Sequence, residues 1–197
     1  MVAQLGFVRG RKMAEMKKKR QSRRAFLNEF HLNEKGEYVY EGKMIGFVEK
    51  SVTYRQYLKQ TCKTAILIFI FTAAAECLPA VTMSKFGVTM ISWLGQIIVA
   101  CLVLYAIWRI FWGKNPMREY VYKASQEKLP TRALLMSFFS FFTAASETVF
   151  ILVKGCAGEV LFTILRPIFS LICGLMSVYL YRLAKNTKWE QVEGNEN

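Results

Sequence analysis

Four long apolar stretches constrain this chain more than any other feature of its sequence. They cover residues 64–83, 88–112, 133–153 and 160–183, and a charged residue is rare within them. A helix of about 20 residues is about 30 Å long, which matches the hydrocarbon thickness of a lipid bilayer. The sequence therefore predicts an all-α membrane protein with four transmembrane helices.

The polar segments between these stretches predict how the chain is oriented. Residues 1–63 hold 15 Lys or Arg against six Glu, and the connection 113–132 holds five Lys or Arg, whereas the two short turns hold only Lys85 and Lys154. Basic residues collect in loops on the cytoplasmic side of a membrane. We expect a multi-pass protein of the plasma membrane with its N-terminus and C-terminus in the cytoplasm. The tail 184–197 is rich in Glu and Asn and is expected to be disordered.

A short motif occurs once in each half of the apolar region. It reads Ile-Phe-Thr-Ala-Ala-Ala-Glu at 70–76 and Phe-Phe-Thr-Ala-Ala-Ser-Glu at 141–147, an offset of 71 residues. The repetition predicts two tandem transmembrane hairpins, 64–112 and 133–183, that enter the membrane from the same side. Such hairpins would be parallel repeats related by a pseudo-twofold axis along the membrane normal. Chance similarity between Ala-rich helices is the alternative.

Each apolar stretch carries one strongly polar residue at a similar depth. This depth is about 10 Å from the short turn that connects the two stretches of each hairpin. These residues are Glu76, Gln96, Glu147 and Arg166. Intramembrane ionisable residues often mark an ion or proton path. The functional hypothesis is therefore a small transport or permeation component, or a subunit of one, with these four residues as its polar site. Because two carboxylates face one Arg, Glu76 would stay protonated or bind a cation.

A structural interpretation of the same residues remains open. In it, Glu147 and Arg166 neutralise each other, and a protonated Glu76 donates to Gln96 across the first hairpin. Helical spacing supports an inward polar face in either case. The residues that share these faces are Thr72 with Glu76, Ser92 with Gln96, Ser137, Ser140 and Ala144 with Glu147, and Arg166 with Ser170, Gly174 and Ser177.

The N-terminal segment carries a basic cluster and a strand-like pattern. The cluster consists of Lys17, Lys18, Lys19, Arg20, Arg23 and Arg24, and its position ahead of a membrane favours contact with anionic lipid headgroups over nucleic acid. Alternating residues at 37–41 and 44–48 predict a small β-hairpin, with a linker as the alternative. The second functional hypothesis is accordingly a non-enzymatic membrane scaffold whose basic N-terminus binds anionic lipid or a cytoplasmic partner.

The residue inventory argues against catalysis. The chain has no Asp, a single His (His31) and five Cys without a paired CxxC spacing, and no nucleotide-binding or hydrolase motif is present. We expect no enzymatic activity, no metal and no cofactor. Four helices leave little room for a wide substrate path, so a homodimer or a larger membrane complex is also expected.

Overall fold

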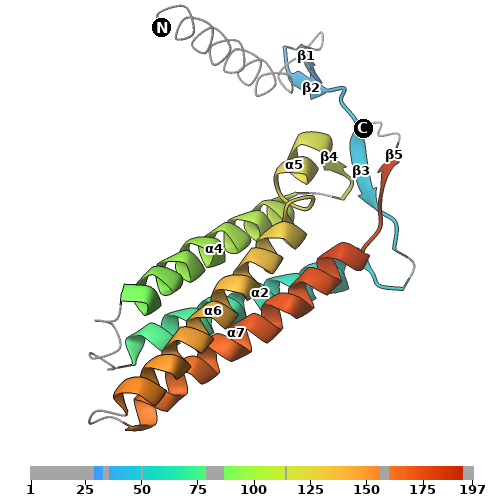
Figure 1. Ribbon diagram of the computed structural model, residues 1–197. Helices are drawn as coiled ribbons and strands as arrows, with labels where there is room; N and C mark the ends of the chain where they lie inside the picture. Colours follow the sequence, from blue (N-terminus) through green and yellow to red (C-terminus); the bar gives the residue numbers. More distant parts are fainter. Residues whose placement is uncertain are drawn as a thin grey trace, which may run out of the picture.

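Four long helices form most of the computed structural model (Figure 1), which describes residues 29–32, 36–49, 51–78, 87–113, 115–155 and 160–192. They are α2 (Tyr54–Cys77), α4 (Gly87–Trp112), α6 (Leu129–Lys154) and α7 (Val160–Asn186). Each of them is long and apolar enough to cross a membrane. The prediction of a mostly helical protein with four such helices is confirmed.

The first helix begins well before the apolar stretch that predicted it. α2 starts at Tyr54, where the backbone N–H of Thr53 donates to Oε1 of Gln56 (3.1 Å). This contact satisfies a backbone donor at the helix start, where the helix itself offers no partner. The early turns of α2 expose the side chains of Lys59 and Lys63. Local capping and exposed polar residues thus extend the helix beyond its apolar part.

The long helices form an up-down-up-down bundle. α2 packs against α4 and α7, and α6 packs against the same two helices. α2 and α6 begin at the end of the bundle that carries a small β-sheet, whereas α4 and α7 begin at the opposite end (Figure 1). We call these the sheet end and the far end. Consecutive helices are therefore antiparallel neighbours, as in other four-helix bundles with short connections.

The buried side chains of the bundle change from apolar to polar along its axis. Its sheet half is mainly apolar and contains Ile68, Val99, Val103, Ile107, Ile110, Leu129, Met136 and Leu180. Its far half buries polar side chains instead, namely Thr72, Thr89, Ser92, Gln96, Ser140, Thr143, Ser146, Glu147, Thr163, Arg166 and Ser170. We call this second group the polar half of the bundle. The inward polar faces predicted from helical spacing are confirmed by the burial of their described members.

The outer surface of the helices is apolar. Ile91, Phe138 and Leu152, on α4 and α6, are 71%, 61% and 80% exposed. Many other large apolar side chains of the four helices are exposed as well. Large contiguous apolar surfaces of this kind mark contact with lipid or with a protein partner.

A three-stranded antiparallel sheet lies at the sheet end. Its central strand is β3 (Met44–Phe47), flanked by β4 (Met117–Arg118) and β5 (Trp189–Val192). In register, Met44 faces both Arg118 and Val192. The short helix α5 (Glu119–Ala124) follows β4 and leads into α6. Two distant parts of the chain therefore flank β3.

The predicted hairpin has the right strands but the wrong pairing. β2 (Tyr38–Tyr40) pairs with the preceding strand β1 (Phe30–Leu32), and β3 does not pair with β2. A hairpin between β2 and β3 would have left the other edge of β3 without partners. The observed sheet supplies β3 with hydrogen-bonding neighbours on both edges, from the middle connection and from the C-terminal segment.

Residues 184–192 differ from the expected disordered tail 184–197, of which residues 193–197 lie outside the described part of the chain. α7 continues to Asn186, and β5 pairs with β3 over four residues, from Trp189 opposite Phe47 to Val192 opposite Met44. The Trp189 ring lies 5.3 Å from that of Phe47 and contacts Tyr54, Tyr57 and Tyr122 as well. We call these five rings the aromatic cluster. Partial burial of Trp189 among these rings helps to hold this polar segment against β3.

One glycine ends α6 in a conformation that other residues avoid. Gly155 has φ 70° and ψ 180°, and its N–H donates to the carbonyl of Ile151 (2.9 Å). We expect Gly155→Ala to lower the free energy of unfolding by about 1–3 kcal/mol, because only glycine adopts this region without strain. Thermal unfolding in detergent measures the effect. Gly87→Ala is the matched control, since a methyl group there meets no atom within 4 Å; equal effects of the two changes would contradict the prediction.

Candidate polar site in the helix bundle

Helical spacing places the polar side chains of α4, and those of α6, on one face of each helix. On α4, Thr89, Ser92 and Gln96 follow one another at intervals of three and four residues, so they share one face. The same spacing relates Ser140 to Glu147 on α6, two turns apart. All five side chains are buried. Each helix thus directs a polar stripe toward its neighbours and an apolar face outward.

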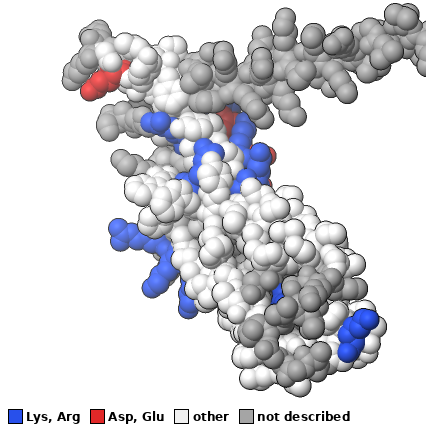
Figure 2. Space-filling view, turned by 90° about the vertical axis from the view of Figure 1, so that its left-hand side faces the viewer, with Lys and Arg blue, Asp and Glu red and all other residues white. Residues whose placement is uncertain are grey.

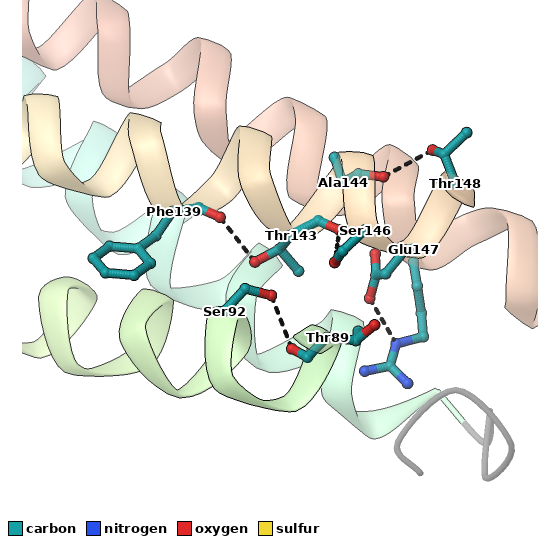
Figure 3. A network of polar contacts seen from close by, with 9 residues as sticks. Thr89, Ser92, Phe139, Thr143, Ala144, Ser146, Glu147 and Thr148 are labelled. Carbon is teal, nitrogen blue, oxygen red and sulfur yellow. Dashed lines mark hydrogen bonds and ion pairs between the residues drawn. The ribbon is translucent and has the colours of Figure 1, made fainter. Parts of the chain in front are cut away.

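A buried ion pair lies nearest the far end of the bundle. Glu147 Oε1 of α6 is 3.4 Å from Nε of Arg166 on α7, and the two side chains are 1% and 4% exposed. Figure 3 shows the Glu147 carboxylate directed at the guanidinium, with Thr89 of α4 beside the pair. Thr163, one turn before Arg166, is buried too. Two opposite charges in a dry interior attract each other strongly, but removing them from water is costly.

A second set of contacts lies at mid-bundle. The hydroxyl of Thr72 on α2 donates to the carbonyl of Ile68 (2.8 Å), and Nε2 of Gln96 approaches the Thr72 oxygen at 3.5 Å. The Cys173 thiol on α7 lies 3.6 Å from the same oxygen and donates to the Ile68 carbonyl. These contacts join three helices next to the apolar sheet half. The border between the polar half and the sheet half is therefore at Thr72, Gln96 and Cys173.

Several hydroxyls in the polar half bond to the backbone of their own helix. Ser92 donates to the carbonyl of Thr89, Thr143 to that of Phe139, and Ser146 to that of Thr143, at 2.8–2.9 Å (Figure 3). These bonds satisfy the hydroxyl donors without linking the helices. Such side chains make the interior polar at little cost to packing.

Three buried polar atoms of the polar half have no hydrogen-bond partner among the described residues. They are Oγ1 of Thr89, Oε1 of Gln96 and Oγ of Ser140, and each belongs to a side chain that is almost completely buried. Buried polar atoms are usually paired, since leaving one unpaired costs about 1–3 kcal/mol. Ordered water is the usual partner in such cases. The chemistry of this half of the bundle thus suits water or another small polar guest.

The structure brings together some of the residues singled out in the sequence. Glu147 and Arg166 form a pair, whereas Gln96 contacts Thr72 at mid-bundle. Glu76 lies in the last turn of α2, but its side chain falls outside the described residues, as does the basic cluster at 17–24.

Sequence reasoning missed four buried polar side chains of the polar half and one buried thiol beside them. They are Thr89, Thr143, Ser146 and Thr163, together with Cys173. Spacing from Ser92 and Gln96 pointed to Thr89, and the repeated motif itself contained Thr143 and Ser146. Within the described part of the chain, no three His, Cys, Asp or Glu side chains converge as metal ligands. No protein-family model, no curated protein and no solved structure matches this chain.

Proposed function

We propose that the chain is an integral protein of the plasma membrane that crosses the bilayer four times, with both termini in the cytoplasm. Its exposed apolar helix surface supports a lipid environment. Figure 2 shows most Lys and Arg side chains around the sheet-side part of the molecule, a basic group at the opposite end, and a largely uncharged surface between them. The helix segments from Arg132 to Lys154 and from Val160 to Arg182 are each about 33 Å long, close to the thickness of a bilayer core.

The arrangement of the helices supports two parallel repeats. α2 and α6 occupy one diagonal of the bundle and begin at the same end, as a twofold axis along the bundle requires. The motif threonines also behave alike: Thr72 donates to Ile68 and Thr143 to Phe139, both at 2.8 Å. The two threonines are 71 residues apart, and so are their two acceptors, which is the offset found in the sequence.

Within this frame the protein acts as a small transport or permeation component, or as a subunit of one. The observation that carries this proposal is the polar half of the bundle, where a buried ion pair and three unpartnered polar atoms lie inside an apolar exterior. Polar groups in a membrane interior are costly and mark pathways for ions, protons or polar solutes. The apolar sheet half would then act as the closed barrier of the path, since narrow apolar segments exclude water.

Flux through reconstituted vesicles tests the proposal. We expect purified protein to dissipate proton or monovalent-ion gradients, and Ser140→Ala and Gln96→Leu to reduce the rate severalfold, because each removes a polar group that is open to a guest. Thr148→Val is the matched control, since that hydroxyl is on the exposed face of α6. Flux no greater than in protein-free vesicles, or flux that neither Ser140→Ala nor Gln96→Leu reduces, would count against it.

The scaffold hypothesis is supported by a separate observation at the sheet end. Leu32 and Tyr38, on the β1–β2 pair, are 61% and 73% exposed, so this pair presents apolar side chains away from the bundle. A cytoplasmic partner or anionic lipid bound by the N-terminal segment would use this end. Deleting residues 1–28 tests it better than deleting 1–63, because residues 38–63 supply β2, β3 and the start of α2. Unchanged recovery of partners by the shortened protein would argue against a scaffold.

A further inference from the structure

One level of the bundle contains a polar side chain from each of the four long helices. Nε2 of Gln96 on α4 is 3.5 Å from the Thr72 oxygen on α2, and the Cys173 thiol on α7 is 3.6 Å from the same oxygen. Ser140 of α6 belongs to this level because of the way α6 packs against its neighbours. We call these four residues the border layer, since they lie next to the apolar sheet half.

A close contact between α4 and α6 places Ser140 near Gln96. A methyl group on Gly95 would meet the ring of Phe139, so the two helices approach closely there. Gln96 directly follows Gly95, and Ser140 directly follows Phe139. Because the helices are antiparallel neighbours, Gln96 and Ser140 lie within about one helical turn of the same level.

A similar contact on the other side of α6 places Ser140 near Cys173. A methyl group on Gly174 of α7 would meet the ring of Phe141. Cys173 directly precedes Gly174, and Ser140 directly precedes Phe141. The border layer therefore brings the four helices together at one point along the bundle, with Ser140 opposite Thr72.

Three oxygens of the border layer offer lone pairs to a guest. The Thr72 hydroxyl has given its hydrogen to the Ile68 carbonyl at 2.8 Å, so its oxygen can only accept. Oε1 of Gln96 is an amide oxygen and also only accepts. This atom and Oγ of Ser140 have no partner among the described residues, and all three side chains are almost completely buried. A guest held by these oxygens must be a cation or a hydrogen-bond donor.

The charge of the border layer favours a cation of low charge. The layer contains no carboxylate, and Glu147 and Arg166, closer to the far end, neutralise each other as a pair. Divalent cations are usually held by carboxylates or keep several waters, whereas K⁺ can exchange its hydration shell for neutral oxygens. The Gln96 amide is held only by a long contact of 3.5 Å, so it can turn its oxygen toward a guest.

We infer that the border layer binds an alkali-metal cation, with the oxygens of Thr72, Gln96 and Ser140 as its ligands. This inference deepens the proposed function and rests on it for the route by which the cation reaches the layer. It names the solute as a monovalent metal cation rather than a proton or a neutral molecule. The cation would stop at the border because the sheet half beyond it is apolar.

Equilibrium binding to the full-length protein in detergent tests the site without any need for flux. The probes are radiolabelled Na⁺ and radiolabelled Rb⁺, the second as a tracer for K⁺, with N-methylglucamine as the only other cation. They are titrated against wild type, Ser140→Ala and Gln96→Leu. Thr148→Val is the matched control, because it removes a hydroxyl from the exposed face of α6.

We expect saturable binding of Na⁺ or Rb⁺ by wild type and Thr148→Val with equal Kd, and a Kd at least about tenfold weaker in Ser140→Ala and Gln96→Leu. Ser140→Ala should unfold at the wild-type temperature in N-methylglucamine, since it removes a hydroxyl without a described partner. Alkali cations should then raise the unfolding temperature of wild type but not of Ser140→Ala. This difference separates loss of the site from loss of the fold.

The binding measurement and vesicle flux fail separately. Saturable binding that depends on Ser140 and Gln96, without flux in vesicles, would support the site and contradict transport. Flux without saturable cation binding would overturn the site and leave transport of another solute. Binding of equal strength in wild type, Ser140→Ala and Gln96→Leu would also overturn it, and the unpartnered oxygens would then be partners for water alone.

Discussion

Glu147→Gln and Arg166→Gln are each expected to lower the free energy of unfolding by about 3–5 kcal/mol, because either change leaves one buried charge without its partner. The two side chains are almost fully buried and 3.4 Å apart. In the double variant both charges are gone, and the neutral amides can still hydrogen-bond. The double variant should therefore recover most of the loss, so that the effects of the two single changes do not add.

Wild type, the two single variants and the double variant form a double-mutant cycle. Their thermal or denaturant unfolding in detergent gives the coupling energy between Glu147 and Arg166 directly. Glu190→Gln, on the exposed strand β5, is the control for loss of a carboxylate. A neutral or stabilising effect of Glu147→Gln would contradict the prediction. It would show that the carboxylate is held at a cost to stability, as functional groups often are, and would make flux measurements on this variant the next step.

Trp189→Ala is the change with the second-largest expected effect, a loss of about 3 kcal/mol or more. Trp189 is the one residue of β5 that joins the aromatic cluster, where it contacts the rings of Phe47, Tyr54, Tyr57 and Tyr122. Its removal should release β5 from β3. Trypsin should then cleave after Lys185 or Lys188 much faster than in wild type, which limited proteolysis measures alongside thermal unfolding.

Gln191→Ala is the control for this prediction. Gln191 is on the same strand and pairs with Ile45 through the backbone, but its side chain is exposed. We expect wild-type stability and wild-type cleavage for this variant. Equal cleavage of Trp189→Ala and wild type would show that β5 is held by its backbone pairing alone.

The polar faces of the helices were predictable because they depend only on spacing within one helix. Ser92 and Gln96, or Ser140 and Glu147, share a face in any α-helix, and an apolar outer surface leaves the interior as the place for them. Spacing within one helix does not fix the partners on other helices. The Glu147–Arg166 pair was one of two interpretations of the sequence, and the contact of Gln96 with Thr72 was not expected, because contacts between helices depend on their axial offset. The side chain of Glu76 lies outside the described residues.

In the small sheet, local sequence pattern predicted the strands but not their pairing. The strand-forming residues at 38–40 and 44–47 were recognisable from alternation and glycine placement, but strand pairing is decided by which edges come together in space. The partners of β3 lie at 117–118 and 189–192, far away in sequence. The C-terminal segment has too few apolar residues to predict order, and it becomes ordered only because Trp189 meets an aromatic cluster assembled from other parts of the chain.

The sequence by itself determined that the chain forms four long apolar helices with polar stripes on one face, because apolar length and helical periodicity are properties of each segment alone. Only the tertiary structure decided that Glu147 meets Arg166, that the interior divides into an apolar sheet half and a polar half, and that the middle connection and the C-terminal segment complete one sheet around β3. These features depend on the relative offset of segments far apart in the chain, which packing sets and local sequence does not encode.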